Sequence, residues 1–430
     1  MKVLTTLAVT LPLLALPARS EAQTAPILTL AEALRAAERS NPELAAVRAL
    51  AEATAARVPG AGRPPDPVVQ VGVMNLALPE LSASMPASMA PSVQAMQMLP
   101  VPGTLGRAER MADQTRRMAD ARVEERAWEI RAAVAAEFFT VYRIDGELEV
   151  VARNARLVAD LREVAQARYA SGEGPQADVL RAGVEVARLD MEIRRLESLR
   201  SAAVARLNAR MGQSAQSEIP AVELPALPAS TPTAEVLSGW AEEVRPALDE
   251  ARTAVARART GVEQARSALW PDATIGVQYG RRPTSSGGEH MVGAMVGFTI
   301  PVFARSRQLK GRDEARALAA EAEAVLQRTR VDVAAAIIEG LADLERARAL
   351  LTLYRSEVVP LAEANAASAL ASYRAGAVDF MTVLEARLGQ NEHERNIPAL
   401  IADYGRALTR LEATVGRPMP LGETLAREER

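Results

Sequence analysis

The sequence predicts a mixed α and β membrane protein built from two copies of one long unit. A motif that recurs at a constant offset indicates the two copies, and two charge-poor segments of alternating pattern indicate strands. Hydrophobic residues make up 49% of the chain but aromatic residues only 3%, and much of the apolar share is alanine. This composition is typical of long packed helices rather than of an ordinary globular core.

The repeat is clearest in a tyrosine–glycine motif that occurs twice. Tyr169 and Gly172 form the first copy, and Tyr373 and Gly376 form the second copy 204 residues later. Because glycine readily adopts the left-handed conformation that ends a helix, each motif predicts the turn of a helical hairpin. The expected organisation is repeat 1 at 23–218, a proline-rich linker at 219–233, repeat 2 at 234–416 and a C-terminal tail at 417–430.

Residues 1–22 have the pattern of a secretory signal peptide. Lys2 precedes a short apolar stretch, and Ala22 ends a cleavage site of small residues. The alternative is a membrane anchor, but the apolar stretch contains two prolines and is short for a membrane span. We therefore expect export and removal of this segment.

Apolar residues at helical spacing predict three helices in the first copy. A capping box at Thr29 and Glu32 marks the start of the first helix, which Pro42 divides. The second would be about 100 Å long at about 1.5 Å per residue, and Gly146 is its weak point, at a cost of about 1 kcal/mol relative to alanine. The predicted ranges are Thr29–Val58, Leu105–Tyr169 and Gln176–Met211, and in the second copy a helix that ends at Trp270, one from about Ser306 to Tyr373, and one that ends at Val415.

Each copy also contains a predicted β-hairpin, at about 67–100 and about 273–301. Valines alternate with polar or small residues in the first, and Ile275, Val277 and Tyr279 do so in the second. This pattern is typical of a barrel strand with one face toward lipid and one toward a wet lumen, although a strand of a soluble sandwich alternates too. Four strands cannot close a barrel, and open edges are not tolerated in lipid, so three chains would supply twelve strands.

The two-copy layout, the tyrosine–glycine turns and the closing Leu207…Gly212 and Leu411…Gly416 resemble the TolC family of outer-membrane efflux proteins. The resemblance covers nearly all of the chain after the signal. It implies a homotrimer with a twelve-stranded β-barrel among outer-membrane lipid and an α-helical coiled-coil periplasmic tunnel. It also implies two partners, a periplasmic adaptor (membrane fusion) protein and an inner-membrane pump of the RND type.

The resemblance also implies a gate. Tunnel tips in the family often carry an acidic ring on an Asp-Val-Leu-Asp pattern that follows the tyrosine–glycine turn. Asp178 matches its first acid, and Glu385 matches its second acid in the other copy, where Thr382 replaces the first. Acids gathered at a narrow opening would favour cations. The alternative is that these are solvated helix residues, with Asp178 near a helix N-terminus.

Methionines are concentrated in and after the first hairpin. Thioethers are soft ligands that suit Cu(I), but methionine also fills irregular apolar surfaces, and we expect no resident metal here. Residues 99–106 also resemble heavy-metal efflux members of the family, so heavy-metal cations such as copper are the expected cargo; multidrug efflux and type I protein secretion are the alternatives. The methionines are Met74, Met85, Met89, Met96, Met98, Met111 and Met118.

Other classes of function find little support in the sequence. A formal net charge of -3 gives no basic surface for nucleic acid. The chain has no cysteine, so it has no disulfide, no thiolate metal site and no lipid-bearing cysteine. No catalytic or cofactor motif is present, so we expect no enzyme. A secreted coiled-coil scaffold without a pore is the less favoured alternative, because it would not need charge-poor strands at matching places.

Overall fold

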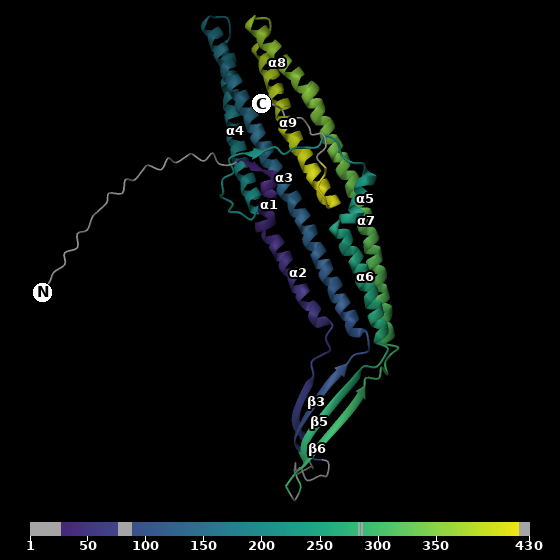
Figure 1. The fold of residues 1–430 in the computed structure, drawn as a ribbon. Coiled ribbons are helices and arrows are strands. Elements are labelled where there is room, and N and C mark those ends of the chain that lie inside the picture. The colour runs from purple at the N-terminus through teal and green to yellow at the C-terminus, as the bar shows by residue number, and fades with distance from the viewer. Residues whose placement is uncertain (1–26, 76–87, 283, 285–286, 421–430) are drawn as a thin grey trace, which may run out of the picture.

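The computed structural model describes residues 27–75, 88–282, 284 and 287–420. Helices form most of the elongated molecule, and a small sheet extends from one end (Figure 1). The predicted signal peptide at 1–22, residues 421–430 of the tail and Met85 lie outside the described residues.

The element order repeats once along the chain: each copy has a two-residue strand, two shorter helices, two hairpin strands, one long helical stretch and one return helix. The first copy consists of β1 (Leu28–Thr29), α1 (Leu30–Ser40), α2 (Pro42–Ala61), β2 (Val68–Met74), β3 (Met89–Leu99), α3 (Thr104–Ala170) and α4 (Gln176–Arg210). The second consists of β4 (Val222–Glu223), α5 (Ala234–Val244), α6 (Pro246–Ser267), β5 (Ala273–Arg282), β6 (Glu289–Phe298), α7 (Gln308–Leu353), η1 (Tyr354–Val358), α8 (Val359–Arg374) and α9 (Phe380–Val415).

Helix α3 is the axis of the fold, because α2, α4, α6 and α9 all pack on it. It has 67 residues, is continuous, and does not break at Gly146. A Cβ at this position would lie 2.5 Å from the Cβ of Pro398 on α9. Gly146 is therefore a point of close helix approach, and the helix continues through the residue at which a weak point was predicted.

The counterpart of α3 in the second copy is interrupted, whereas one helix was predicted from about Ser306 to Tyr373. Tyr354–Val358 forms a π-helical turn between α7 and α8. Pro360, the second residue after this turn, lacks an N–H group, and its ring would clash with the carbonyl oxygen of Ser356 in a regular α-helix. The wider π turn relieves that clash. A smaller correction concerns the predicted end of the first helix at Val58, because α2 continues through Pro59 to Ala61.

The linker between the copies also contains a strand that was not predicted. Residues of β4 pair in parallel with β1, with Leu28 opposite Val222 and Thr29 opposite Glu223. This pairing attaches the start of the described chain to the linker beside the middle of the helical part (Figure 1).

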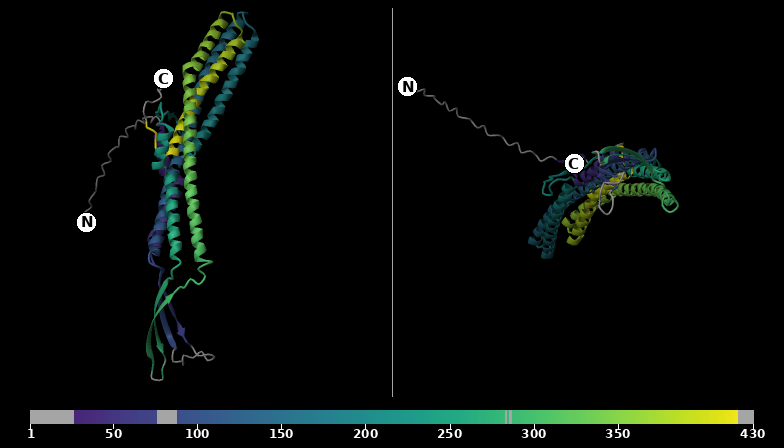
Figure 2. Two further views of the ribbon diagram at one scale, coloured as in Figure 1. Left: turned by 90° about the vertical axis from the view of Figure 1, so that its right-hand side faces the viewer. Right: turned by 90° about the horizontal axis from the view of Figure 1, so that it is seen from below.

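Seen along its length, the helical part is a curved layer. The view from below in Figure 2 shows the helices arranged along an arc rather than as a round bundle. A large cluster of buried apolar side chains includes Val134, Phe138 and Phe139 of α3, and a smaller one joins the hairpin tips. Among the described residues, no helix combines the length and the apolar character that a membrane span requires.

Candidate functional site

The two helical hairpins end side by side at the tip farthest from the sheet (Figure 1). Gly172 and Gly376 have φ angles of 81° and 75°, in the left-handed region. After them, the N–H of Glu173 donates to the carbonyl oxygen of Arg168, and the N–H of Ala377 donates to that of Ser372. These bonds satisfy carbonyl groups at the helix ends, so the two repeated motifs form equivalent turns, as predicted.

Tyr373 connects the two hairpins at this tip. Only 3% of its surface is exposed, and its hydroxyl donates to the Asp178 carboxylate of α4 at 3.5 Å. Burial, and then the charge of Asp178, raises the pKa of the Tyr373 hydroxyl. The hydroxyl therefore keeps the proton that it donates.

Arg168 at the end of α3 adds two further contacts to the same tyrosine. Its Nη1 donates to the Tyr373 carbonyl oxygen at 2.6 Å, and its guanidinium lies 4.7 Å from the centre of the Tyr373 ring. The Phe380 ring of α9 packs edge to face against the Tyr373 ring, with the ring centroids 5.9 Å apart. We call Arg168, Asp178, Tyr373 and Phe380 the tip cluster.

The predicted gate residues lie in different surroundings. Asp178 is buried within the protomer, whereas Thr382 and Glu385 are exposed on α9. Asp379 caps α9, accepts from the hydroxyl and the N–H of Thr382, and has a lowered pKa chiefly because of the hydroxyl bond. Within one chain, Asp178 and Glu385 therefore do not face a shared space, and Glu385 is the acid that is free to meet solvent or another chain.

An ion-pair network lies farther along the helices, where sequence reasoning indicated nothing. It borders a groove of about 930 Å³ between α3, α4 and α9. Arg395 of α9 approaches Glu192 of α4 at 2.9 Å and Glu147 of α3 at 3.6 Å. Hydrogen bonds from Arg195, and then the charge of Arg395, lower the pKa of Glu192 to about 2. Positive and negative groups alternate in the network, so it links three helices rather than creating a field of one sign.

The sheet has one apolar face, and that face is exposed. Its four strands run antiparallel in the order β2-β3-β5-β6. Val71, Val93, Tyr279 and Val292 lie opposite one another in one row, and Val71 and Val292 expose 73% and 81% of their surface. A sheet in a water-soluble protein buries such an apolar row in the core, so the exposure of this row indicates a lipid-facing surface.

The opposite face is polar and more enclosed. Its rows include Gln70, Gln94 and Gln278 directly opposite one another, and Ser92 beside Gly280. Gln278 is half-buried, and Gly280 and Ser92 are buried, although no other described helix or strand packs over the sheet. We call this side the concave face, because a barrel that turns the valine row toward lipid curves around it.

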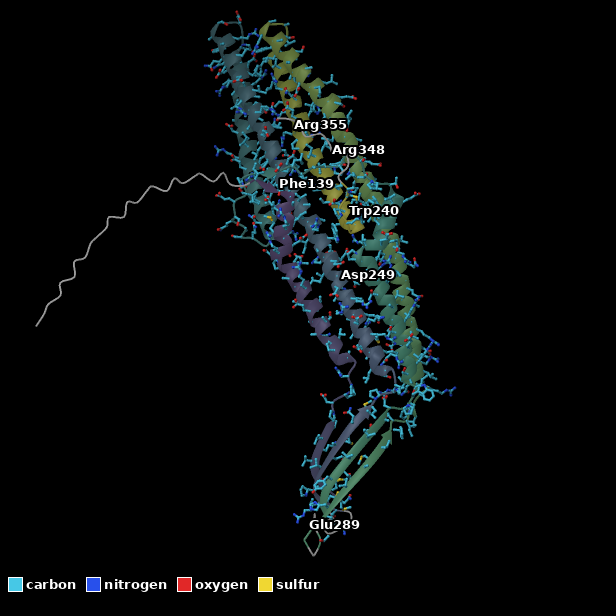
Figure 3. All side chains as sticks on the ribbon, viewed as in Figure 1. Phe139, Trp240, Asp249, Glu289, Arg348 and Arg355 are labelled. Atoms are coloured by element: carbon cyan, nitrogen blue, oxygen red, sulfur yellow. The ribbon has the colours of Figure 1, made fainter. Side chains whose placement is uncertain are left out.

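Charged residues lie at the end of the sheet that is far from the helices. Arg282 and Glu289 form an ion pair at 3.0 Å, and Figure 3 shows Glu289 near that end. At the other end, the Trp270 side chain, which is 70% exposed, lies at the junction between α6 and β5. Polar groups at one end and an exposed tryptophan at the other bracket the apolar face, as at membrane–water interfaces.

Comparison with known proteins shows which family and which solved structures this chain is similar to. Residues 237–417 match a family model described as outer membrane efflux protein. A sequence comparison with curated proteins gave no match. Among solved structures, the chain is similar to the outer-membrane channel OprN, with 18% identity, a TM-score of 0.76, and coverage of 90% of this chain and 89% of that chain.

Two further solved structures share the fold. The outer membrane protein VceC of Vibrio cholerae has 18% identity and a TM-score of 0.75, with coverage of 90% of this chain and 96% of that chain. CusC, described in terms of transmembrane channel formation, has 15% identity and a TM-score of 0.75, with coverage of 90% of this chain and 92% of that chain. The predicted mixed α and β fold class is confirmed.

Proposed function

We propose, from the premise that this chain belongs to the outer membrane efflux protein family, that it is the exit duct of a tripartite efflux system. The protein lies in the outer membrane, extends into the periplasm, and is a passive channel rather than an enzyme. In this proposal an inner-membrane pump supplies the energy and a periplasmic adaptor protein joins the pump to the helical tips. The sequence resemblance favours a pump of the RND type.

The proposal rests chiefly on the four-stranded sheet, which has an exposed apolar face and two open edges. Strands β2 and β6 each pair on one side only. Lipid contains no water to hydrogen-bond the free groups at such edges. If β6 of one chain pairs with β2 of the next, three chains close a twelve-stranded barrel around the polar concave faces. The curved helical layers would then form the wall of a periplasmic tunnel. A secreted scaffold without a pore would not need the exposed valines.

We expect detergent-solubilised mature protein to have about three times the mass of one chain by light scattering, and to conduct ions in planar bilayers. Val71→Arg should abolish this assembly, because a charge on the lipid face costs about 2–4 kcal/mol at the bilayer midplane and each trimer would contain three. Gln70→Arg is the matched control, since the neighbouring side chain lies on the concave face and should leave the trimer intact. Equal trimer yields from the two variants would contradict the proposed orientation.

The cargo is a finer proposal. The resemblance of residues 99–106 to heavy-metal efflux members and the soft sulfur ligands of the methionines favour metal cations such as copper. Multidrug efflux and type I protein secretion use the same kind of duct and are the alternatives. Export itself requires a signal, and we propose that cleavage near Ala22 removes residues 1–22.

We propose that the tip is the gate and that Glu385 contributes to a ring of acids there. Three exposed Glu385 side chains near one opening would attract cations. Glu385→Gln should therefore lower the preference of the channel for K⁺ over Cl⁻, as measured from reversal potentials in planar bilayers. Glu363→Gln, at an exposed position earlier on α8, is the control. Unchanged selectivity in an assembled Glu385→Gln trimer would show that the acids near the tip do not select ions.

A further inference from the structure

The concave face of the sheet gathers methionine side chains from both hairpins. Register places Met96, Met98, Met291 and Met295 on the same face as the glutamine row, because paired and alternate residues share a face. Met89 lies over Gly280, which belongs to that face, and Met74 pairs with Met89. Six of the 14 methionines of the chain therefore lie on this face: Met74, Met89, Met96, Met98, Met291 and Met295.

Two of these side chains converge over one glycine. Gly276 of β5 pairs with Met96 of β3 on one side and with Met295 of β6 on the other. A Cβ on Gly276 would lie 2.8 Å from Cγ and 3.3 Å from Sδ of Met295, and 3.2 Å from Cγ of Met96. The strands of the two methionines are two spacings apart, about 9.5 Å. The missing side chain of Gly276 thus allows both methionines to fold over the same point.

Filling of an apolar core does not account for this arrangement. Methionine usually fills gaps between apolar side chains, and Val68 does lie opposite Met96, but one neighbouring row contains the glutamines. The Gln94 amide donates to Sδ of Met295 at 3.1 Å, so a lone pair of this sulfur already meets a polar partner. In the same row, Oε1 of Gln278 is buried and has no hydrogen-bond partner. This oxygen lies in the row next to the two methionines, where a water or a bound ion can meet it.

We propose that Met96 and Met295 form a thioether subsite for a soft monovalent cation, Cu(I) or Ag(I), on the lumen wall of the barrel. Uncharged sulfur ligands select soft cations over Na⁺, Mg²⁺ or Ca²⁺, which prefer oxygen. The other four methionines continue the same surface, so a cation can exchange between neighbouring thioethers. Conduction requires sites that bind weakly enough to release, and neutral thioethers meet that need better than thiolates. This inference rests on the proposed duct, because it takes the concave face as the lumen.

The test is silver binding by the assembled protein. Purified trimer in detergent is dialysed against AgNO₃ in chloride-free buffer, and bound silver per chain is measured by mass spectrometry. We expect Met96→Leu with Met295→Leu to weaken silver binding at least tenfold, because leucine keeps the volume but removes the sulfur. Met118→Leu with Met191→Leu, at two helical positions, is the matched control and should bind silver as the wild type does. A tenfold excess of Zn²⁺ should not displace the silver.

Each result has one reading. Equal silver binding by the sheet variant and the wild type overturns the subsite, as does equal loss in the helical control. Conductance in planar bilayers is recorded for the same preparations. If the trimers conduct ions but silver binding does not depend on Met96 and Met295, the thioether subsite is wrong and the proposed duct stands. If the protein binds silver but forms no conducting trimer, the proposed duct is wrong.

Discussion

Gly405→Leu is expected to abolish accumulation of the trimer, and Gly405→Ala to lower its stability strongly. A Cβ on Gly405 of α9 would lie 2.1 Å from Cζ and 2.3 Å from Cε1 of Phe139 on α3. Figure 3 shows Phe139 midway along the helical part. The phenyl ring is fully buried and meets the Phe138 ring edge to face at 5.8 Å, so it has no free space in which to retreat.

The size of the effect follows from overpacking. An extra methylene in a packed core costs about 1–3 kcal/mol and occasionally more, and leucine adds several atoms beyond the first. Gly389→Ala is the control in the same helix, because no atom lies within 4 Å of its added Cβ. Alanine there should be neutral or stabilise the helix by about 1 kcal/mol. Urea unfolding followed by circular dichroism, together with trimer yield, measures both variants.

A second substitution identifies the cause. Phe139→Leu removes part of the ring that meets the new Cβ, so the Gly405→Ala defect should be smaller in the Phe139→Leu background than in the wild type. Residues in contact deviate from additivity by about 0.5–3 kcal/mol. Strict additivity of the two changes, or equal stability of Gly405→Ala and Gly389→Ala, would show that the close approach of α3 and α9 does not limit stability.

Local chemistry made much of the fold predictable. Gly172 and Gly376 end helices in the left-handed conformation, as the two motifs indicated. The alternation of β5 and β6 predicted which face is apolar, and the charge-poor segments predicted where strands occur. In these places the backbone preference of a residue and its polarity point to the same structure, so no knowledge of distant contacts is needed.

What the sequence could not supply are contacts between the copies. Gly146 and Gly405 appear in the sequence as weak helix formers, and their partners Pro398 and Phe139 are more than 240 residues away in chain order. The sequence also indicated only the methionines in and after the first hairpin, not those of the second hairpin. Met291 and Met295 join it because β3 pairs with β5, and this pairing joins the first hairpin to the second.

The gate residues illustrate the same limit. Tyr169 and Tyr373 are equivalent in the repeat, yet the first is 48% exposed and the second 3%. Asp178 and Thr382 are equivalent too, and only Asp178 meets a tyrosine of the other hairpin in the same chain. A repeat predicts equivalent conformations, but each copy has a different neighbour. The surroundings of these residues therefore depend on packing that sequence alone does not give.

Arg168→Ala is expected to increase conductance through the tip. If cargo must part the two hairpins of each chain, the contacts of Arg168 and Asp178 with Tyr373 are lost on opening, and removing one of them favours the open state. Hydrogen bonds to charged groups are worth about 1.5–3 kcal/mol, and each 1.4 kcal/mol changes a population ratio about tenfold. The open fraction in planar bilayers should thus rise roughly tenfold or more. Arg162→Ala, an exposed arginine on the same helix, is the control.

Tyr373→Phe separates the hydrogen bond from the packing. Phenylalanine keeps the ring against Phe380 and beneath Arg168 but cannot donate to Asp178. At 3.5 Å this bond is long, so its loss should raise the open fraction less than the loss of the Arg168 side chain does. The double variant should exceed both. Wild-type conductance in assembled Arg168→Ala trimers would show that the hairpins of one chain stay together during transport. Opening would then occur between chains, where the exposed Tyr169 and Glu385 are free to meet a neighbour.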